Sequence, residues 1–212
     1  MTTGELRGYV TSIRQIAKEF KGRLSILCGL ECEYFPEYLP YLRELLETDD
    51  PAKRIDYAIL GHHYDSNEMH GMYYGACTTL KDAARYANQI IAAMQTNIFA
   101  YVAHPDIFLR QFTAFSDELA SISRDICQAS KAFGVPLEFN LYGVRKKATP
   151  IKPYGLGYPD NNFWKIAAET GSPAIIGIDA HEPYHIADAE LFTLAEMYLE
   201  LLGIHRVQKL NL

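Results

Sequence analysis

The feature that most constrains the fold is a repeated alternation of short β-rich runs with longer stretches of helical periodicity. Parallel strands need a long, usually helical, connection between them, so this alternation predicts β-α units around a parallel sheet or barrel. No internal repeat, low-complexity segment or linker-like composition divides the chain, and we expect a single domain over residues 1–212. Strands are predicted at 24–29, 57–61, 98–103, 136–140 and 174–178, with a weaker one near 206–210.

Helical patterns lie between and around these strands. Ser116 stands at a helix start, and Gly134 ends the same helix before the next strand. Two segments, 65–79 and 142–160, contain Gly, Pro, Asn and Tyr without a clear period, so we expect long loops of the kind that often build active sites. The predicted helices are 6–20, 37–47, 80–94, 118–133, 163–170 and 187–202.

Composition excludes several kinds of partner. The formal net charge is -6 and the basic residues are scattered, which disfavours binding to nucleic acid. No run approaches the roughly 20 apolar residues that span a bilayer, and the first residues lack the apolar part of a signal peptide, so we expect no membrane partner and a cytoplasmic location. Cys28 and Cys32 could form a metal-binding pair, but their apolar surroundings favour buried, reduced thiols.

Metal-binding residue types gather at one kind of position. Glu31, His63, His104, Asp179 and His181 fall at or just past the carboxyl ends of four predicted strands. In β/α barrels these ends converge on the active-site face, and a carboxylate with several imidazoles suits Zn, Mn or Fe. Each residue alone also has a structural explanation, such as Asp179 capping a helix. Together they predict a divalent-metal site. Alternation along an extended segment predicts that His62 and His63 point to opposite sides.

A family resemblance is carried by short segments in a fixed order. Together they resemble the PHP phosphoesterases, and Glu138-Phe139-Asn140 with Gly143 is most similar to the histidinol-phosphatase branch of that family. The resemblance implies an α/β fold built as a distorted, TIM-like β/α barrel that holds a cluster of metal ions. The matching segments are Gly29-Leu30-Glu31-Cys32-Glu33-Tyr34, Ile59-Leu60-Gly61-His62-His63-Tyr64, Ala103-His104-Pro105-Asp106, Leu137-Glu138-Phe139-Asn140 and Gly177-Ile178-Asp179-Ala180-His181.

The resemblance also implies roles for single residues. Glu31 would bridge two ions, and His63 and His104 would complete one of those sites. Asp179 and His181 would each serve a different remaining ion. The family opens with a strand carrying a His-x-His pair, followed by further metal-binding sequence, and residues 1–23 resemble only the helix that normally comes after those elements. We therefore expect an N-terminally shortened, incomplete barrel.

Arg145 follows the predicted strand that ends at Asn140. From a loop, its guanidinium could hold a substrate phosphate through two hydrogen bonds, and the alternative is a solvated arginine. The expected catalytic residues are thus Glu31, Asp179 and Arg145.

The resemblance implies a metal-dependent phosphomonoesterase that acts on a small phosphorylated metabolite such as histidinol phosphate, in histidine biosynthesis. Absent N-terminal ligands would impair that activity, and the alternative is a metal-binding remnant or regulatory relative without catalysis. A nuclease or polymerase proofreading domain fits poorly with the acidic charge. Strand edges left open by a shortened barrel predict a homo-oligomer.

Overall fold

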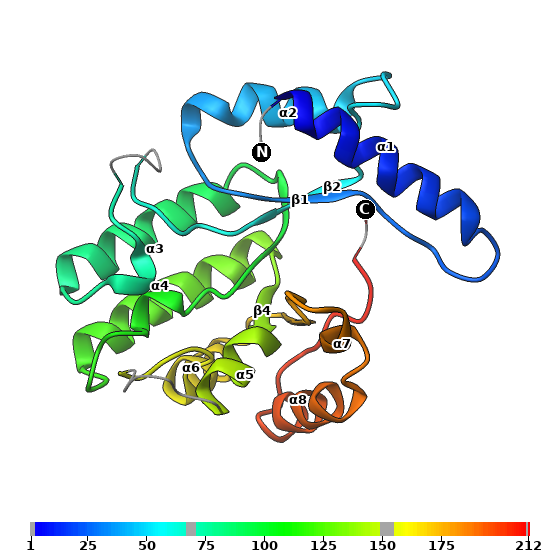
Figure 1. Cartoon of the computed structure of the whole chain (residues 1–212). Helices are drawn as coiled ribbons and strands as arrows, with labels where there is room; N and C mark the ends of the chain where they lie inside the picture. Colours follow the sequence, from blue (N-terminus) through cyan, green and yellow to red (C-terminus); the bar gives the residue numbers. More distant parts are fainter. Residues whose placement is uncertain (1–2, 67–70, 149–154, 211) are drawn as a thin grey trace.

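The computed structural model describes residues 3–66, 71–148, 155–210 and 212 of the 212-residue chain (Figure 1). Its centre is a sheet of parallel strands in the order β1-β2-β3-β4-β5, so every strand pairs with the next one along the chain. The sheet does not close into a complete barrel within the described residues. The predicted parallel α/β architecture is therefore confirmed, and the sheet is open. The strands are β1 (Gly29–Cys32), β2 (Tyr57–Leu60), β3 (Phe99–Val102), β4 (Leu137–Asn140) and β5 (Ala174–Gly177).

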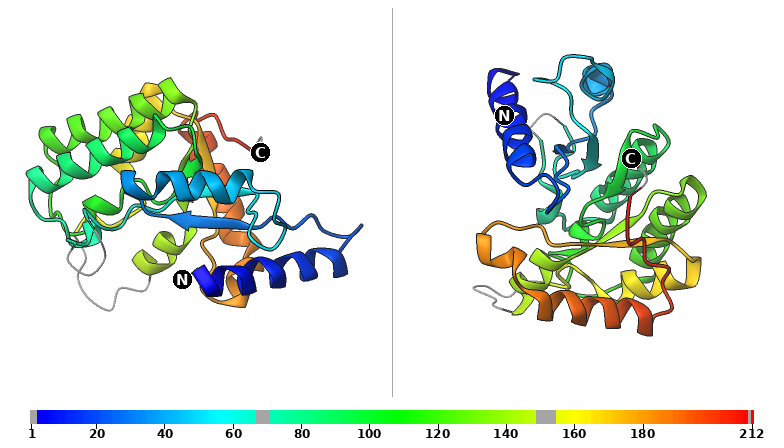
Figure 2. Two further views of the ribbon diagram at one scale, coloured as in Figure 1. Left: turned by 90° about the horizontal axis from the view of Figure 1, so that it is seen from above. Right: turned by 90° about the vertical axis from the view of Figure 1, so that its right-hand side faces the viewer.

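Helices connect and cover these strands. Figures 1 and 2 show α3, α4 and α6 side by side along the middle of the sheet, whereas α1 and α2 lie near β1 and β2, and α5 and α8 lie beyond β4. No helix in the described part of the chain is long and apolar enough to cross a membrane. The helices are α1 (Thr3–Glu19), α2 (Leu39–Glu47), α3 (Leu80–Met94), α4 (Asp117–Phe133), α5 (Leu141–Ala148), α6 (Asn161–Thr170), α7 (Pro183–Ile186) and α8 (Ala189–Leu201), with short 3-10 turns η1 (Pro36–Tyr38), η2 (Tyr74–Ala76) and η3 (Ile107–Leu109).

Local chemistry explains where several helices begin and end. The Ser116 side chain accepts a hydrogen bond from the Leu119 N–H and so caps α4, as the sequence predicts. Gly134 ends that helix in a left-handed conformation with φ 67°, which costs glycine little. Asp160 caps α6 by accepting from two backbone N–H groups. The caps of α4 and α6 define where these helices begin, and so they set the lengths of the segments that join the helices to the strands.

The core lies between the sheet and α3, α4 and α6 and extends to buried residues of α1, α2 and α8. Its largest fully buried side chains include Trp164, Tyr74, Tyr86, Phe108 and Phe163, each of which removes a large apolar surface from water. The four cysteines are all free, and Cys28 is buried as the sequence predicts, whereas Cys32 is only half-buried.

Three sequence predictions of local structure need correction. The first strand is Gly29–Cys32 and does not include 24–28, because inter-strand pairing begins only where Gly29 meets Tyr57. Part of the predicted loop 142–160 is helical, since the Asn140 side chain accepts from the Gly143 N–H and starts α5 directly after β4. The weak strand near 206–210 is only a single bridge between Ala174 and Arg206. Residues 149–154, and residues 67–70 of the other predicted loop, lie outside the described part of the chain.

Asp106 generates a prediction about pH and stability. Its side chain is fully buried, one oxygen accepts from the Asp160 N–H at 2.6 Å, and the other has no hydrogen-bond partner within the described residues. Burial raises the pKa of Asp106 to about 7 from an ordinary value of 3.8. The protonated Asp106 carboxyl therefore makes its full contribution to the free energy of unfolding below about pH 4. This contribution is lost as the pH rises through 7.

Asp106→Asn should abolish this pH dependence because the amide keeps the acceptor and cannot ionise. We expect the free energy of unfolding of the natural chain to fall relative to the variant by up to about 4 kcal/mol between pH 4 and pH 8, measured by urea denaturation. Asp49→Asn, at an exposed position, is the matched control. A constant difference between the chain and Asp106→Asn across this range would contradict a buried, protonated carboxyl.

Candidate metal centre

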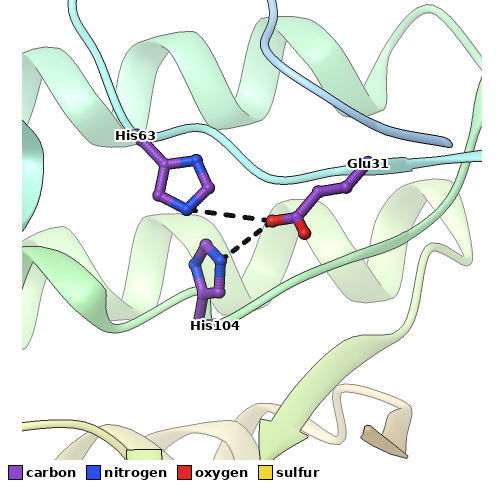
Figure 3. A group of neighbouring side chains, drawn as sticks. All are labelled: Glu31, His63 and His104. Carbon is purple, nitrogen blue, oxygen red and sulfur yellow. Dashed lines mark hydrogen bonds and ion pairs between the residues drawn. The ribbon is translucent and has the colours of Figure 1, made fainter. Parts of the chain in front are cut away.

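Glu31, His63 and His104 come together at the carboxyl ends of the first three strands. Glu31 lies within β1, and not past its end as the sequence predicts, because β1 starts later than expected. His63 and His104 follow β2 and β3. Figure 3 shows both imidazoles facing the Glu31 carboxylate. The structure confirms that β2 and β3 end just before His63 and His104, as the sequence predicts.

Gly61 makes this meeting possible. It follows β2 directly, and the Glu31 side chain crosses the sheet over it. A Cβ atom at position 61 would overlap Glu31 Oε1, so only glycine leaves room for the carboxylate in this place.

The distances fit a small cation. His104 Nε2 lies 3.1 Å and His63 Nε2 lies 3.8 Å from Glu31 Oε1. One ligand atom from each of the three residues lies within 4.8 Å of the other two. Ligands about 2 Å from a tetrahedral ion are separated by a little over 3 Å, so small side-chain movements would bring all three into contact with one ion. A carboxylate with two imidazoles also matches Zn, Mn or Fe.

Electrostatics at the centre favour positive charge. Burial acts to raise the pKa of Glu31, but the His104 hydrogen bond and the charges of both imidazoles outweigh burial and lower it. Burial acts to lower the pKa of His104, and the Glu31 hydrogen bond with nearby carboxylates outweighs it and raises that pKa. Both shifts reflect the attraction between the Glu31 carboxylate and the neighbouring imidazoles.

A chain of hydrogen bonds below the centre fixes the His104 backbone. The buried Glu138 side chain accepts from the His104 N–H at 2.9 Å and from Asn140 Nδ2 at 2.8 Å. Asn140 Nδ2 also lies 3.0 Å from Asp179 Oδ2, which links the ends of β3, β4 and the segment after β5. His104 and Asp179 both hold left-handed backbone, with φ 32° and 45°, a conformation that non-glycine residues adopt mainly at constrained sites.

Asp179 and His181 do not join the three-residue group. Within the described residues, the candidate metal-binding group contains only Glu31, His63 and His104. His181 is half exposed, pairs with the Asp179 carbonyl at 3.0 Å, and stacks on Tyr142 with 3.9 Å between ring centroids. Their assignment to further metal ions stays a prediction.

Arg145 lies in α5 and not in a loop, which corrects the sequence-based placement. Its guanidinium donates to the Ile178 and His185 carbonyls and pairs with Asp188 at 3.1 Å. These contacts hold α5 against the segment that leads into α8. A role for Arg145 in holding phosphate stays a prediction.

A polar pocket beside the centre was not foreseen from the sequence. It has a volume of about 270 Å³, and it adjoins the metal-binding group through Tyr73, which stacks on His63, and Tyr158, which meets the edge of His104. Three basic side chains contribute to its wall. The lining residues are Tyr73, Arg110, Tyr142, Gly143, Lys146, Lys147, Gly157 and Tyr158.

Fold and site together define an α/β protein with a candidate metal centre at the carboxyl edge of an open parallel sheet. A scan against models of known families gave no match. The chain is 26% identical to "Probable histidinol-phosphatase" of Deinococcus radiodurans, over 89% of the chain and 72% of that protein. It is also 26% identical to "Histidinol-phosphatase" of Bacillus subtilis, over 86% of the chain and 73% of that protein.

A solved structure of a similarly named protein has a similar fold. The histidinol phosphate phosphatase of Lactococcus lactis, crystallised with Zn, L-histidinol and phosphate, superposes with a TM-score of 0.64 at 19% identity and covers 95% of the chain. The match spans 76% of that structure. The chain thus resembles histidinol-phosphatases in sequence and in fold, and the PHP family of phosphoesterases is consistent with this resemblance.

Gly61→Ala tests the geometry of the centre. The new Cβ would displace the Glu31 carboxylate, so we expect affinity for Zn²⁺ to fall by about tenfold or more. Competition with a chelating dye measures the change. Gly8→Ala, where nothing lies within 4 Å of the added atom, is the control and should bind as the natural chain does. Equal affinities for all three proteins would show that Glu31 is not a ligand.

Proposed function

We propose that the chain is a metal-dependent phosphomonoesterase whose substrate is histidinol phosphate or a close phosphorylated metabolite. The observation that carries the proposal is the convergence of Glu31, His63 and His104 in a chain whose relatives are named histidinol-phosphatases. A cytoplasmic location and a part in histidine biosynthesis belong to the same proposal.

Glu31, His63 and His104 would hold a Zn, Mn or Fe ion, and Asp179 with His181 would serve a further one. A divalent ion in such a site activates water and offsets charge at phosphorus. Glu31 would supply the negative charge, while the two histidines, which both face its Oε1 atom, would supply neutral donors. The hydrogen bonds of Asn140 and Glu138 would hold the ends of β3 and β4 and the segment after β5 in fixed positions.

The adjoining pocket supports a phosphorylated substrate. Arg110, Lys146 and Lys147 line it, and no carboxylate is among its described lining residues. Basic side chains suit phosphate oxygens, and the Tyr73 and Tyr158 rings could pack against the organic part of the substrate. The substrate would thus lie with its phosphate between this pocket and the His63–His104 pair.

A second candidate function is metal binding without catalysis. The observation that favours it is that, among the described residues, one three-ligand group forms while Asp179 and His181 remain outside it. Weak or absent turnover with a tightly bound ion is the expected behaviour of such a protein.

The direct test is phosphate release from histidinol phosphate with added Mn²⁺ or Zn²⁺. We expect slow turnover, below about 1 per second, because of the absent N-terminal ligands, and a further loss of about 100-fold or more in Glu31→Gln, because the carboxylate would both bind the ion and balance its charge. Glu44→Gln, at an exposed position in α2, is the matched control. Metal binding without phosphate release would favour the second candidate, and absence of metal binding would reject both.

Self-association is a further part of the proposal. The β1 and β5 strands lie at the ends of the open sheet, and α8 exposes Leu194, Met197 and Leu201, which are 54%, 60% and 83% exposed. We expect a homodimer that covers this helix face. Light scattering should give twice the chain mass of 24.0 kDa, and Met197→Glu should reduce it. A 24.0 kDa species at high protein concentration would contradict the dimer.

A further inference from the structure

The Glu33 carboxylate joins the end of β1 to the segment that carries His63. One oxygen accepts from the His63 N–H at 2.7 Å and from the Tyr64 N–H at 3.2 Å. The other lies 3.0 Å from His63 Nδ1. The Glu33 side chain is only 17% exposed, so these contacts are sheltered from water.

These contacts set the proton on His63. One oxygen of Glu33 accepts from two backbone N–H groups, which is the geometry of a carboxylate acceptor. An ionised carboxylate can only accept, so Nδ1 of His63 must carry the hydrogen. In the neutral imidazole Nε2 then carries the lone pair, and it lies 3.8 Å from Glu31 Oε1. Two acceptors that face each other across this gap are compatible when a cation lies between them.

His62 has the opposite arrangement. Its ring is fully buried, its Nδ1 accepts from the Tyr34 N–H at 3.2 Å, and its Nε2 lies 3.1 Å from Gln89 Oε1. The Gln89 amide nitrogen donates to the Asp65 carbonyl, which fixes the amide oxygen as the acceptor for His62. His62 therefore carries its hydrogen on Nε2. Although its Nδ1 lies 3.3 Å from Glu33, it does not compete with His63 for the carboxylate.

His104 provides a contrast inside the same centre. Its Nδ1 is buried and has no hydrogen-bond partner within the described residues. Glu33 thus orients His63 through Nδ1, the ring nitrogen that faces away from Glu31. Within the described residues, no carboxylate contacts Nδ1 of His104.

We propose that Glu33 is a positioning residue that holds the Nδ1–H of His63 and thereby aims Nε2 at the metal ion. The inference rests on the proposed metal centre and concerns a residue that would not touch the ion. A carboxylate behind a ligating imidazole fixes its orientation and makes it a stronger donor, and loss of such a group costs about 10–100-fold in metal affinity.

Glu33→Gln tests the assignment with Zn²⁺ alone. The amide keeps the size of the side chain and removes its charge, so Zn²⁺ affinity in competition with a chelating dye should fall about 10–100-fold. Glu37→Gln, an exposed glutamate four positions along the chain, should leave the affinity unchanged. Thermal unfolding of each variant establishes that the fold is retained.

A second readout separates positioning from a general structural effect. In ¹⁵N-labelled chain without metal, NMR should show His63 with hydrogen on Nδ1 and His62 with hydrogen on Nε2. Glu33→Gln should change the tautomer of His63 and leave His62 as it is. Natural affinity in Glu33→Gln, or His63 with hydrogen on Nε2 in the natural chain, would overturn the inference. If the natural chain bound no Zn²⁺, the proposed function would fail, and the tautomer of His63 alone would decide the role of Glu33.

Discussion

The site depends on the hydrogen bond between Glu31 and His104, which links β1 to the end of β3 across β2. The bond is possible only because Gly61 leaves the space above β2 empty. A parallel sheet brings its strand ends to one edge, so a single carboxylate in β1 can reach groups from the next two strands. Glu33, two residues along, lies on the same side of the chain and carries this link to His63.

Charge is arranged in two zones around that link. Glu31, Glu33, Glu138 and Asp179 surround the histidines and favour a cation at the sheet edge. Basic side chains line the neighbouring pocket, with Tyr73 and Tyr158 between the two zones. A candidate cation site next to a pocket lined by basic side chains suits the proposed hydrolysis of a phosphate ester, because charge develops at phosphorus and on the leaving oxygen.

The sequence predicted those parts of the fold that local chemistry controls. Strong apolar runs predicted β2 to β5, Ser116 and Gly134 predicted the ends of α4, and strand ends predicted the meeting of His63 with His104. The first strand was misplaced because the apolar run before Gly29 resembles a strand, whereas pairing with Tyr57 decides where it begins. The helix α5 was missed because its cap, Asn140, is also the last residue of β4, so no separate turn marks the start of the helix. Glu33 was missed because it acts through hydrogen bonds to the backbone and ring of His63, which only the folded structure shows.

The account stands on one claim, that a metal ion sits between Glu31, His63 and His104. Anomalous diffraction from crystals of the chain grown with Zn²⁺ measures this directly. The account predicts a peak about 2.0–2.2 Å from a Glu31 carboxylate oxygen and from Nε2 of both histidines. A peak bound only by Asp179 and His181, or an ion held by Nδ1 of His63, would contradict it.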